Sequence, residues 1–481
     1  MSALISYAPL FPEMLLAIGA LALLMVGAFQ KETEFTAETI TGLAIMLLAA
    51  ASFLVAGPAG ETQTLFDGAF VTDAFARFMK ILVLMGSAGA LLMSFQFLCH
   101  AKMMKFELPV LVLLSTIGMM VMVSANDLIS LYLGLELMSL ALYVLAAFRR
   151  DDVRSSEAGL KYFVLGALSS GMLLYGASLI YGFTGSTSFP IIASVATASA
   201  STNIGLIVGL VFLMVGLAFK VSAVPFHMWT PDVYEGAPTP ITAFFAAAPK
   251  LAAMGLLIRV VGGAFPGFVA QWQQIIIVLS VASMLLGAFG AIGQTNIKRL
   301  MAYSSIGNIG FALVGLAAGT QAGVQAVLIY LAVYLAMTLG VFACMLAMQR
   351  ESGPVEDIAE LSGLQSHNGK LAFALSALMF SLAGIPPLAG FFGKLYVFQA
   401  AVNADLLWLA VVGVVASVVA AYYYIRIIKV IYFDGARAPF TEAGGGVWAV
   451  IAASMAVVLL FVIGGTGVID AAMAAAKSFK L

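Results

Sequence analysis

The chain has 481 residues, of which 63% are hydrophobic and 9% are charged, and its mean hydropathy is +1.08. A soluble protein of this length does not carry so apolar a composition, so the sequence predicts an all-α polytopic membrane protein. The net charge of -1 and the lack of a Lys/Arg-rich block exclude nucleic-acid binding. The two cysteines and three histidines are scattered, so we expect no zinc, haem or iron–sulfur site in this chain.

Apolar segments long enough to cross a bilayer recur along the whole chain. The first is predicted to be a retained helix, because residues 1–29 contain neither a basic amino-terminal region nor a small-residue cleavage site. Connections are mostly short, which predicts one membrane domain over residues 1–481. The fourteen expected helices lie near 9–29, 40–57, 75–98, 107–125, 127–148, 158–182, 204–224, 239–262, 272–293, 301–318, 324–348, 371–399, 405–432 and 447–466.

The distribution of Lys and Arg beside the helix ends predicts the orientation. Most of the 22 Lys and Arg residues flank one side, and cytoplasmic loops carry such an excess. A few, including Arg77, Lys80 and Arg259, are assigned to the other side. With the basic side in the cytoplasm of a bacterium and an even helix count, both termini are expected on the periplasmic side of the inner membrane.

Two predicted helices, the seventh and the twelfth, contain proline at depth. Pro225 and Pro231 interrupt the first, and Pro386 and Pro387 interrupt the second. Proline frees backbone groups, and in a bilayer these are tolerated only against protein or a wet cavity. A simple kink is the alternative for either helix alone. Because each is the fourth of a five-helix set, the pattern predicts two inverted repeats, formed by helices 4–8 and 9–13. The expected divisions are 1–106 for helices 1–3, 107–262 and 272–432 for the repeats, and 447–466 for helix 14.

Four charged residues lie deep inside otherwise apolar segments: Glu136, Lys220, Lys250 and Lys394. A charge at mid-bilayer costs about 2.5 kcal/mol or more on insertion scales, so such residues usually mark an ion pathway. We expect Glu136 and Lys220 to form a buried pair between helices 5 and 7. The alternative is an ion pair that only holds the two helices together.

The remaining candidates carry alternatives of their own. Lys250 follows Pro249 without an acidic neighbour on its own helix, so desolvation is expected to let it exchange protons near neutral pH. Lys394 is either a pathway residue or a lysine that reaches toward the interface. His227 is a proton relay between Lys220 and Lys250, or a hydrogen-bonded side chain at the inner mouth. Lys161 is an inner pathway residue or a positive-inside anchor. Asp232 and Glu235 are expected to shape that mouth.

Three long motifs at these positions resemble the antiporter-like membrane subunits of respiratory complex I, most closely those of the N type in bacteria. They are KVSAVPFHMWTPDVYEGAPTP at residues 220–240, KRLMAYSSI at 298–306, and GIPP with the following GFFGK at 384–394. The resemblance covers essentially the whole chain. The absence of a long carboxy-terminal lateral helix sets it apart from L-type subunits, and lysine at position 394 sets it apart from M-type subunits, which carry glutamate there.

The resemblance implies a proton-translocating subunit of NADH:quinone oxidoreductase without a redox centre of its own. Glu136 and Lys220 would form the gating pair, Lys250 the central relay and Lys394 the terminal lysine, with His227 connecting the halves. NADH, FMN, iron–sulfur clusters and quinone would belong to partner subunits. The implied partners are the other membrane and peripheral subunits, neighbouring antiporter-like subunits and lipids. A stand-alone cation/proton antiporter module and a scaffold subunit whose buried charges only fix packing stay open as alternatives.

Overall fold

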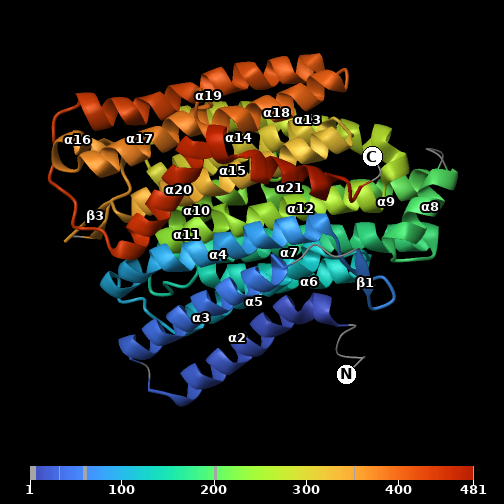
Figure 1. Cartoon of the computed structure of the whole chain (residues 1–481), viewed down its shortest axis with the longest axis horizontal. Coiled ribbons are helices and arrows are strands. Elements are labelled where there is room, and N and C mark those ends of the chain that lie inside the picture. The colour runs from blue at the N-terminus through green and yellow to red at the C-terminus, as the bar shows by residue number, and fades with distance from the viewer. Residues whose placement is uncertain (1–6, 32, 58–61, 200–202, 352, 480–481) are drawn as a thin grey trace.

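The computed structural model describes residues 7–31, 33–57, 62–199, 203–351 and 353–479, and long helices run side by side along its long axis (Figure 1). In chain order the helices are η1 (Ala8–Leu10), α2 (Phe11–Phe29), α3 (Glu34–Val55), α4 (Ala74–His100), α5 (Glu107–Val123), α6 (Leu128–Ala146), α7 (Val153–Thr184), α8 (Phe189–Ser199), α9 (Ile204–Val221), α10 (Trp229–Gly236), α11 (Thr239–Ala246), α12 (Ala248–Gly263), η2 (Pro266–Phe268), α13 (Val269–Ile292), α14 (Ile297–Ala317), α15 (Gln321–Leu346), η3 (Ile358–Leu361), α16 (Leu364–His367), α17 (Gly369–Ala383), α18 (Ala389–Asn403), α19 (Leu407–Phe433), α20 (Gly445–Gly464) and α21 (Thr466–Ala476). Two antiparallel hairpins pair β1 (Gln63–Leu65) with β2 (Phe70–Thr72) and β3 (Gln349–Arg350) with β4 (Gly353–Pro354).

Every predicted segment coincides with a helix or a pair of helices. Among the described residues, 12 helices are long and apolar enough to cross a membrane, and α5 and α17 are shorter apolar helices. The all-α polytopic class is therefore confirmed. Residues 1–6 of the first predicted segment lie outside the described residues. The sequence prediction missed the short helices α8, α10, α16 and α21, because each of them is shorter than a bilayer span.

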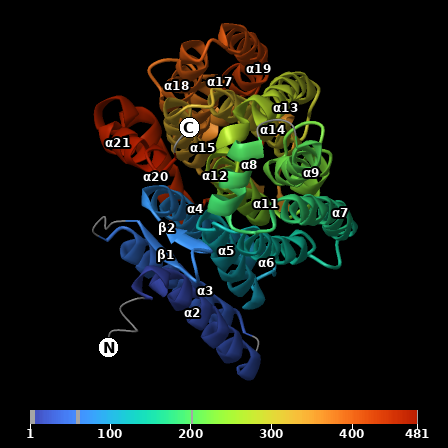
Figure 2. The same ribbon diagram turned by 90° about the vertical axis from the view of Figure 1, so that its right-hand side faces the viewer.

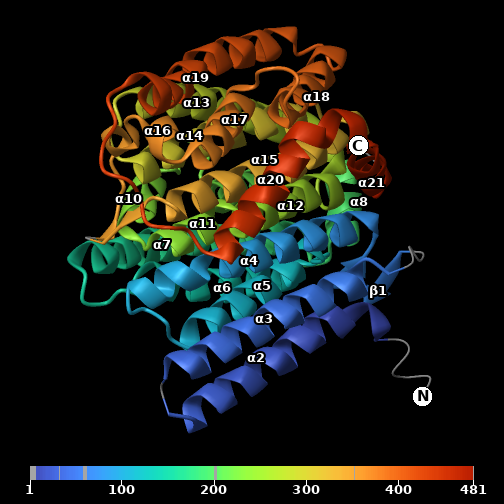
Figure 3. The same ribbon diagram turned by 60° about the vertical axis from the view of Figure 1, so that its left-hand side comes forward.

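The bundle extends from the first helices at one flank to α17–α19 at the other, and the last two helices, α20 and α21, return to pack against α15 and α4 (Figures 1 and 2). Helices α2 and α3 form one flank, α17 to α19 form the opposite flank, and α12, α14 and α15 lie between them. Helix α20 crosses outside α15 and α4 and contacts both (Figure 3). We call the end of the molecule at which α10 and α16 lie the vestibule end, and the end with α8 and β1 the opposite end.

The first proline-containing segment is broken as predicted. Helix α9 ends at Val221, and Ser222 adopts a left-handed conformation with φ 64°. Six residues that include Pro225 then separate this turn from α10. The break leaves Lys220 in the last turn of α9, so its side chain starts where the helix stops.

The second proline-containing segment is also broken. Helix α17 ends at Ala383, Gly384 adopts φ 87°, and α18 begins at Ala389 after the two prolines. The amide of Gly390 approaches the end of α17 closely and donates a hydrogen bond of 3.0 Å to Ser381 Oγ. Lys394 therefore faces the broken end of α17 from the first turns of α18.

Gly390→Ala is expected to destabilise this break. A methyl group at position 390 would lie 1.9 Å from the carbonyl oxygen of Ser381, which is backbone and cannot rotate away. Overpacking of this kind costs about 1–3 kcal/mol. Thermal unfolding of the purified complex should therefore begin at a lower temperature. Gly182→Ala in α7 is the control, because nothing lies within 4 Å of its added methyl, and equal melting of both variants would contradict the prediction.

A third interruption was not predicted. Ala247, with φ -98° and ψ -101°, separates α11 from α12, although residues 239–262 were expected to form one continuous helix. Pro249 occupies the first turn of α12, where its missing N–H costs nothing. The bend places Lys250 in the first turn of a new helix that is buried along its whole length.

Two buried ion pairs near the opposite end differ from the predicted interfacial positions of Lys80 and Arg259. Lys80 Nζ lies 2.6 Å from Glu13 Oε1, and the two side chains are 2% and 5% exposed. Arg259 donates to both carboxylate oxygens of Asp73, at 2.6 and 2.9 Å, and also to the carbonyl of Val123. These basic side chains bind carboxylates from distant helices instead of reaching the membrane surface, so they carry no information about orientation.

Candidate functional site

The side chain of Lys220, from helix α9, packs against helix α6. Its side chain is buried, and its ammonium group donates to Ser139 Oγ at 2.8 Å and to the hydroxyl of Tyr143 at 3.2 Å. The ring of Tyr143 also lies 5.6 Å from the ammonium. Both partners are neutral, so burial of this lysine is compensated by hydrogen bonds and a cation–π contact.

Glu136 and Lys220 do not form the direct ion pair that the sequence analysis predicted. Among the described residues, Glu136 Oε1 is buried without a hydrogen-bond partner, and no contact within 4.0 Å joins this carboxylate to Lys220. The reason is helical spacing: Glu136, Ser139 and Tyr143 lie on one face of α6, and the lysine meets the latter two. The carboxylate lies one turn further along, half-exposed on the flank of the molecule.

Lys250 is the most deeply buried lysine of the candidate set. It is 1% exposed, and its ammonium donates to Ser305 Oγ at 2.5 Å. Ser305 in turn shares a hydrogen bond of 2.8 Å with the hydroxyl of Tyr334, and the ring of Tyr234 lies 5.1 Å from the ammonium. These contacts of the Lys250 ammonium are with neutral groups.

Polar side chains of α14 continue from Lys250 toward Lys394. Ser304, next to Ser305, shares a hydrogen bond of 2.6 Å with Tyr424, and Asn308 accepts one of 2.7 Å from Tyr330. Asn308 also donates to the carbonyl of Ser304, at 2.8 Å. We call Ser304, Ser305, Asn308, Tyr330, Tyr334 and Tyr424 the hydroxyl–amide cluster. Sequence analysis missed it, since single Ser, Asn and Tyr residues do not stand out in an apolar helix.

Lys394 of α18 lies beside Phe311, which is three residues beyond Asn308 on α14. Its ammonium donates to the carbonyls of Leu382 and Ala383, at 2.9 and 3.1 Å, and to Ser417 Oγ at 2.8 Å. The ring of Phe311 lies 4.7 Å away. The two carbonyls are those that the break after α17 leaves without helical partners, so the lysine caps the negative end of this half-helix. Lys394 does not reach the interface.

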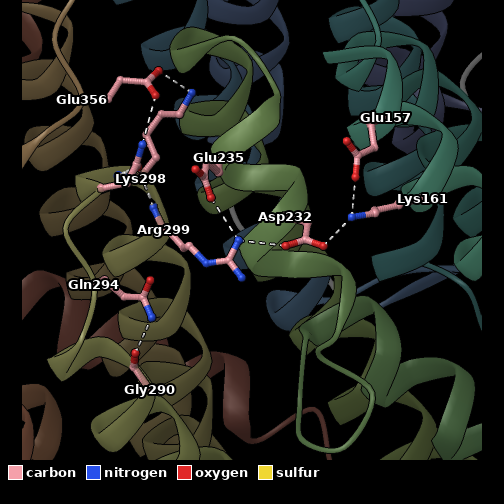
Figure 4. Close-up of polar contacts among 10 residues, drawn as sticks. Glu157, Lys161, Asp232, Glu235, Gly290, Gln294, Lys298, Arg299 and Glu356 are labelled. Carbon is pink, nitrogen blue, oxygen red and sulfur yellow. Dashed lines mark hydrogen bonds and ion pairs between the residues drawn. The ribbon is translucent and has the colours of Figure 1, made fainter. Parts of the chain in front are cut away.

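A network of ion pairs joins three helices at the vestibule end (Figure 4). Asp232 of α10 binds Lys161 of α7 at 2.8 Å and Arg299 of α14 at 2.8 Å, and Arg299 also binds Glu235. Burial alone would raise the pKa of Asp232, but its hydrogen bonds from Lys161 and Arg299 hold that pKa below its usual value. A cavity of about 220 Å³ borders these four residues. Lys161 is thus part of a network and is more than an isolated anchor.

A second cavity of about 290 Å³ adjoins the first and contains a charge that the sequence analysis named only as part of the motif at residues 298–306. Lys298 is 2% exposed and pairs with Glu356 at 2.6 Å, while donating to the carbonyl of Ala237 at 2.9 Å. Glu356 belongs to the segment after α15, so the pair fastens that segment to α14. We call the two cavities with their charged residues the vestibule.

His227 lies in the break between α9 and α10 and is half-buried. The ammonium groups of Lys220 and Lys250 donate to Ser139, Tyr143 and Ser305, and neither hydrogen-bonds to the imidazole in this structure. The predicted relay through His227 is therefore not formed by direct contacts here. Within the described part of the chain, no group of three or more His, Cys, Asp or Glu side chains could hold a metal ion.

Buried lysines beside two broken helices, joined through polar groups inside a polytopic bundle, define an antiporter-like membrane module. The family model described as NADH:quinone oxidoreductase/Mrp antiporter, TM, matches residues 125–420. That stretch includes every lysine and glutamate of the candidate site. The chain belongs to this family and, as its relatives show, to the subunit N type within it.

The relatives are similar along their whole length. NADH-quinone oxidoreductase subunit N of Methylobacterium nodulans is 58% identical over 470 residues, which cover 98% of this chain and 97% of the relative. The subunit N of Rhodospirillum rubrum is 56% identical over 474 residues, with 98% and 97% covered.

Solved structures show the same fold. A chain of respiratory complex I from Thermus thermophilus with bound aureothin matches with a TM-score of 0.81 at 32% identity, covering 95% of this chain and 98% of that one. A chain of the Mrp complex from Dietzia sp. matches with a TM-score of 0.85 at 24% identity, over 98% and 97%. The latter likeness concerns the fold alone.

Proposed function

We propose that this chain is the proton-translocating subunit N of a bacterial NADH:quinone oxidoreductase and that protons pass along Lys220, Lys250 and Lys394. The observation that carries the proposal is a row of three buried lysines with neutral partners. No carboxylate pairs with any of the three among the described residues. A buried ammonium whose hydrogen-bond partners are all neutral gives up its proton more readily than one in a direct ion pair.

The hydroxyl–amide cluster supplies the connection between Lys250 and Lys394. Serine and tyrosine hydroxyls both donate and accept hydrogen bonds, so a chain of them can hand on a proton when one lysine loses its charge and the next gains it. Glu136 regulates the protonation of Lys220. We propose that its carboxylate moves toward Lys220 in one state, stabilising the protonated lysine, and that the separated arrangement seen here releases the proton toward Lys250.

Orientation and repeats complete the proposal. The vestibule, rich in Lys and Arg, faces the cytoplasm under the positive-inside rule, and both termini face the periplasm. Each of the two inverted repeats comprises five of the membrane segments expected from the sequence. Helices α5 to α12 cover the five segments of the first repeat, and α13 to α19 cover those of the second. The two broken helices hold equivalent positions in the repeats. Lys161 and His227 serve the cytoplasmic entry. Moving each proton outward costs about 2.3 kcal/mol per 100 mV, so the chain needs an external source of energy.

That source is electron transfer in partner subunits. NADH, FMN, iron–sulfur clusters and quinone are bound elsewhere in the complex, and this chain couples to them through neighbouring membrane subunits. The competing function is a stand-alone cation/proton antiporter. A scaffold role is the third possibility, and it predicts that neutralised lysines harm assembly and leave turnover intact.

Glu136→Gln tests the proposal in membranes that contain the assembled complex. We expect NADH-driven proton pumping and NADH oxidation to fall together, because the neutral amide cannot stabilise the protonated lysine. Glu442→Gln in the loop before α20 is the control for a lost surface charge, because Glu442 is exposed and lies outside the vestibule. If Glu136→Gln leaves both activities unchanged, the gating role is wrong. If both persist while sodium-dependent proton exchange is lost, the antiporter function replaces the proposal.

A further inference from the structure

A layer of aromatic side chains lies between the vestibule and Lys220. Tyr162 and Trp229 are both 3% exposed, and their rings stack with centroids 4.4 Å apart and planes at 9°. On one side, Tyr162 follows Lys161 directly, and Trp229 precedes Asp232 by less than one helical turn. These two neighbours form an ion pair of the vestibule.

The other side of the layer faces the lysine. Tyr143 meets Tyr162 edge-on at 4.9 Å and 88°, and the hydroxyl of Tyr143 accepts the hydrogen bond from Lys220. Phe245 meets Tyr162 from a further side, at 5.7 Å. The stacked pair therefore links the vestibule ion pair to Tyr143, the hydrogen-bond partner of the lysine.

The stacked pair is fixed to both sides. Trp229 Nε1 donates to the carbonyl of Phe219 at 3.0 Å, one residue before Lys220. Trp229 begins α10, and Asp232 and Glu235 of the same helix are held by Arg299. The position of the Trp229 ring is thereby tied both to the vestibule ion pairs and to the end of α9, and the stacked rings are in van der Waals contact.

Stacked rings separate protons from other cations. An apolar constriction gates by excluding water, and a metal cation that sheds its hydration shell needs several oxygen ligands in return. The layer provides the hydroxyls of Tyr143 and Tyr162, which can hand on a proton, and ring carbons that bind no cation strongly enough. Such a layer is expected to resist sodium more than protons.

We propose that Tyr162 and Trp229 form an ion-selective seal that keeps bulk water and hydrated cations away from Lys220 while the tyrosine hydroxyls leave a route for protons. The seal rests on the proposed function for its role in pumping. Its existence as a barrier does not depend on that role, because a barrier acts with or without turnover. The two ideas can therefore fail separately.

Trp229→Ala tests the seal in liposomes that contain the purified complex and no NADH. We expect an imposed pH gradient to decay several-fold faster than with the unmodified complex, and a sodium-sensitive dye to report sodium entry that the unmodified complex does not allow. Trp229→Phe keeps a ring and should stay tight. Trp272→Ala is the matched control, because Trp272 is also buried and donates its Nε1 hydrogen to a carbonyl, that of Phe265, at 3.0 Å near the opposite end.

Gradients that last equally long with Trp229→Ala, Trp272→Ala and the unmodified complex would overturn the proposal. Faster decay with Trp272→Ala as well would overturn it too, since general loosening would then explain the leak. If Trp229→Ala does not assemble, Trp229→Leu takes its place, because leucine keeps an apolar side chain and loses the stacked ring. The absence of turnover in this assay keeps its outcome distinct from that of Glu136→Gln.

Discussion

Lys220→Ala is expected to lower NADH-driven proton pumping and NADH oxidation together, each by at least about tenfold, in a complex that still assembles. A positioned proton donor typically contributes about 100-fold or more to a transfer step. Alanine removes the ammonium that donates hydrogen bonds to Ser139 and Tyr143, so the proposed proton route loses its first protonatable group. The measurement is paired: acidification of the external medium and NADH consumption in the same membranes, after a native gel has established assembly.

Lys429→Ala is the control for Lys220→Ala. Lys429 is also a lysine of a long helix, but its side chain is 60% exposed and pairs with Asp434 at the end of α19. We expect both activities to stay near those of the unmodified complex. Loss of assembly with Lys220→Ala and unchanged specific activity in the fraction that assembles would favour a scaffold role and contradict the proton route.

Asp73→Ala is expected to produce the largest loss of stability. It leaves the Arg259 guanidinium buried without a counter-charge, and breaking a buried pair in this way costs about 3–5 kcal/mol. The same substitution removes the cap of α4, since Asp73 accepts a hydrogen bond from the amide of Ala76. We expect little assembled complex on a native gel and a markedly lower unfolding temperature for what remains.

Asp434→Ala is the matched control, because it breaks an exposed pair that is worth about 0–1 kcal/mol. The pH dependence offers a second check. Burial would raise the pKa of Asp73, but Arg259 holds it below its usual value. A lowered pKa means that the pair stabilises the fold at neutral pH and that this contribution is lost only as the pH falls through the lowered value. Equal melting of Asp73→Ala and Asp434→Ala would show that the buried pair is dispensable.

Sequence patterns were enough to place the helices and both proline breaks. Length and apolarity determine a membrane span almost alone, because every backbone group in lipid must be bonded within the segment. The buried lysines were found for the same reason, as charges are rare in such segments. Pro249 was visible too, but proline is compatible with the first turn of a helix, so nothing in the sequence announced the bend at Ala247.

The sequence did not predict which side chains from different helices would form ion pairs or hydrogen bonds with one another. Lys80 and Arg259 lie near predicted helix ends. At such positions the sequence does not distinguish a basic residue that reaches the membrane surface from one that forms a buried ion pair. Asp73, the partner of Arg259, is 186 residues away in the chain. Likewise, helical spacing places Glu136 and Ser139 on one face of α6, but it does not say which of them Lys220 meets. These questions depend on how helices pack, for which a single sequence carries no periodic signal.

The negative charge that faces the lysine differs in kind between the two ends of the proposed proton route, Lys394 and Lys220. At Lys394 the counter-charge is the end of α17, worth about half an elementary charge and built into the backbone, so it cannot be withdrawn. At Lys220 the counter-charge is a side chain, Glu136, that lies on the half-exposed flank of α6 and has an unsatisfied oxygen. Under the proposed proton route, a neighbouring subunit would act on Lys220 by moving the Glu136 side chain of α6, whereas the backbone charge at Lys394 stays constant.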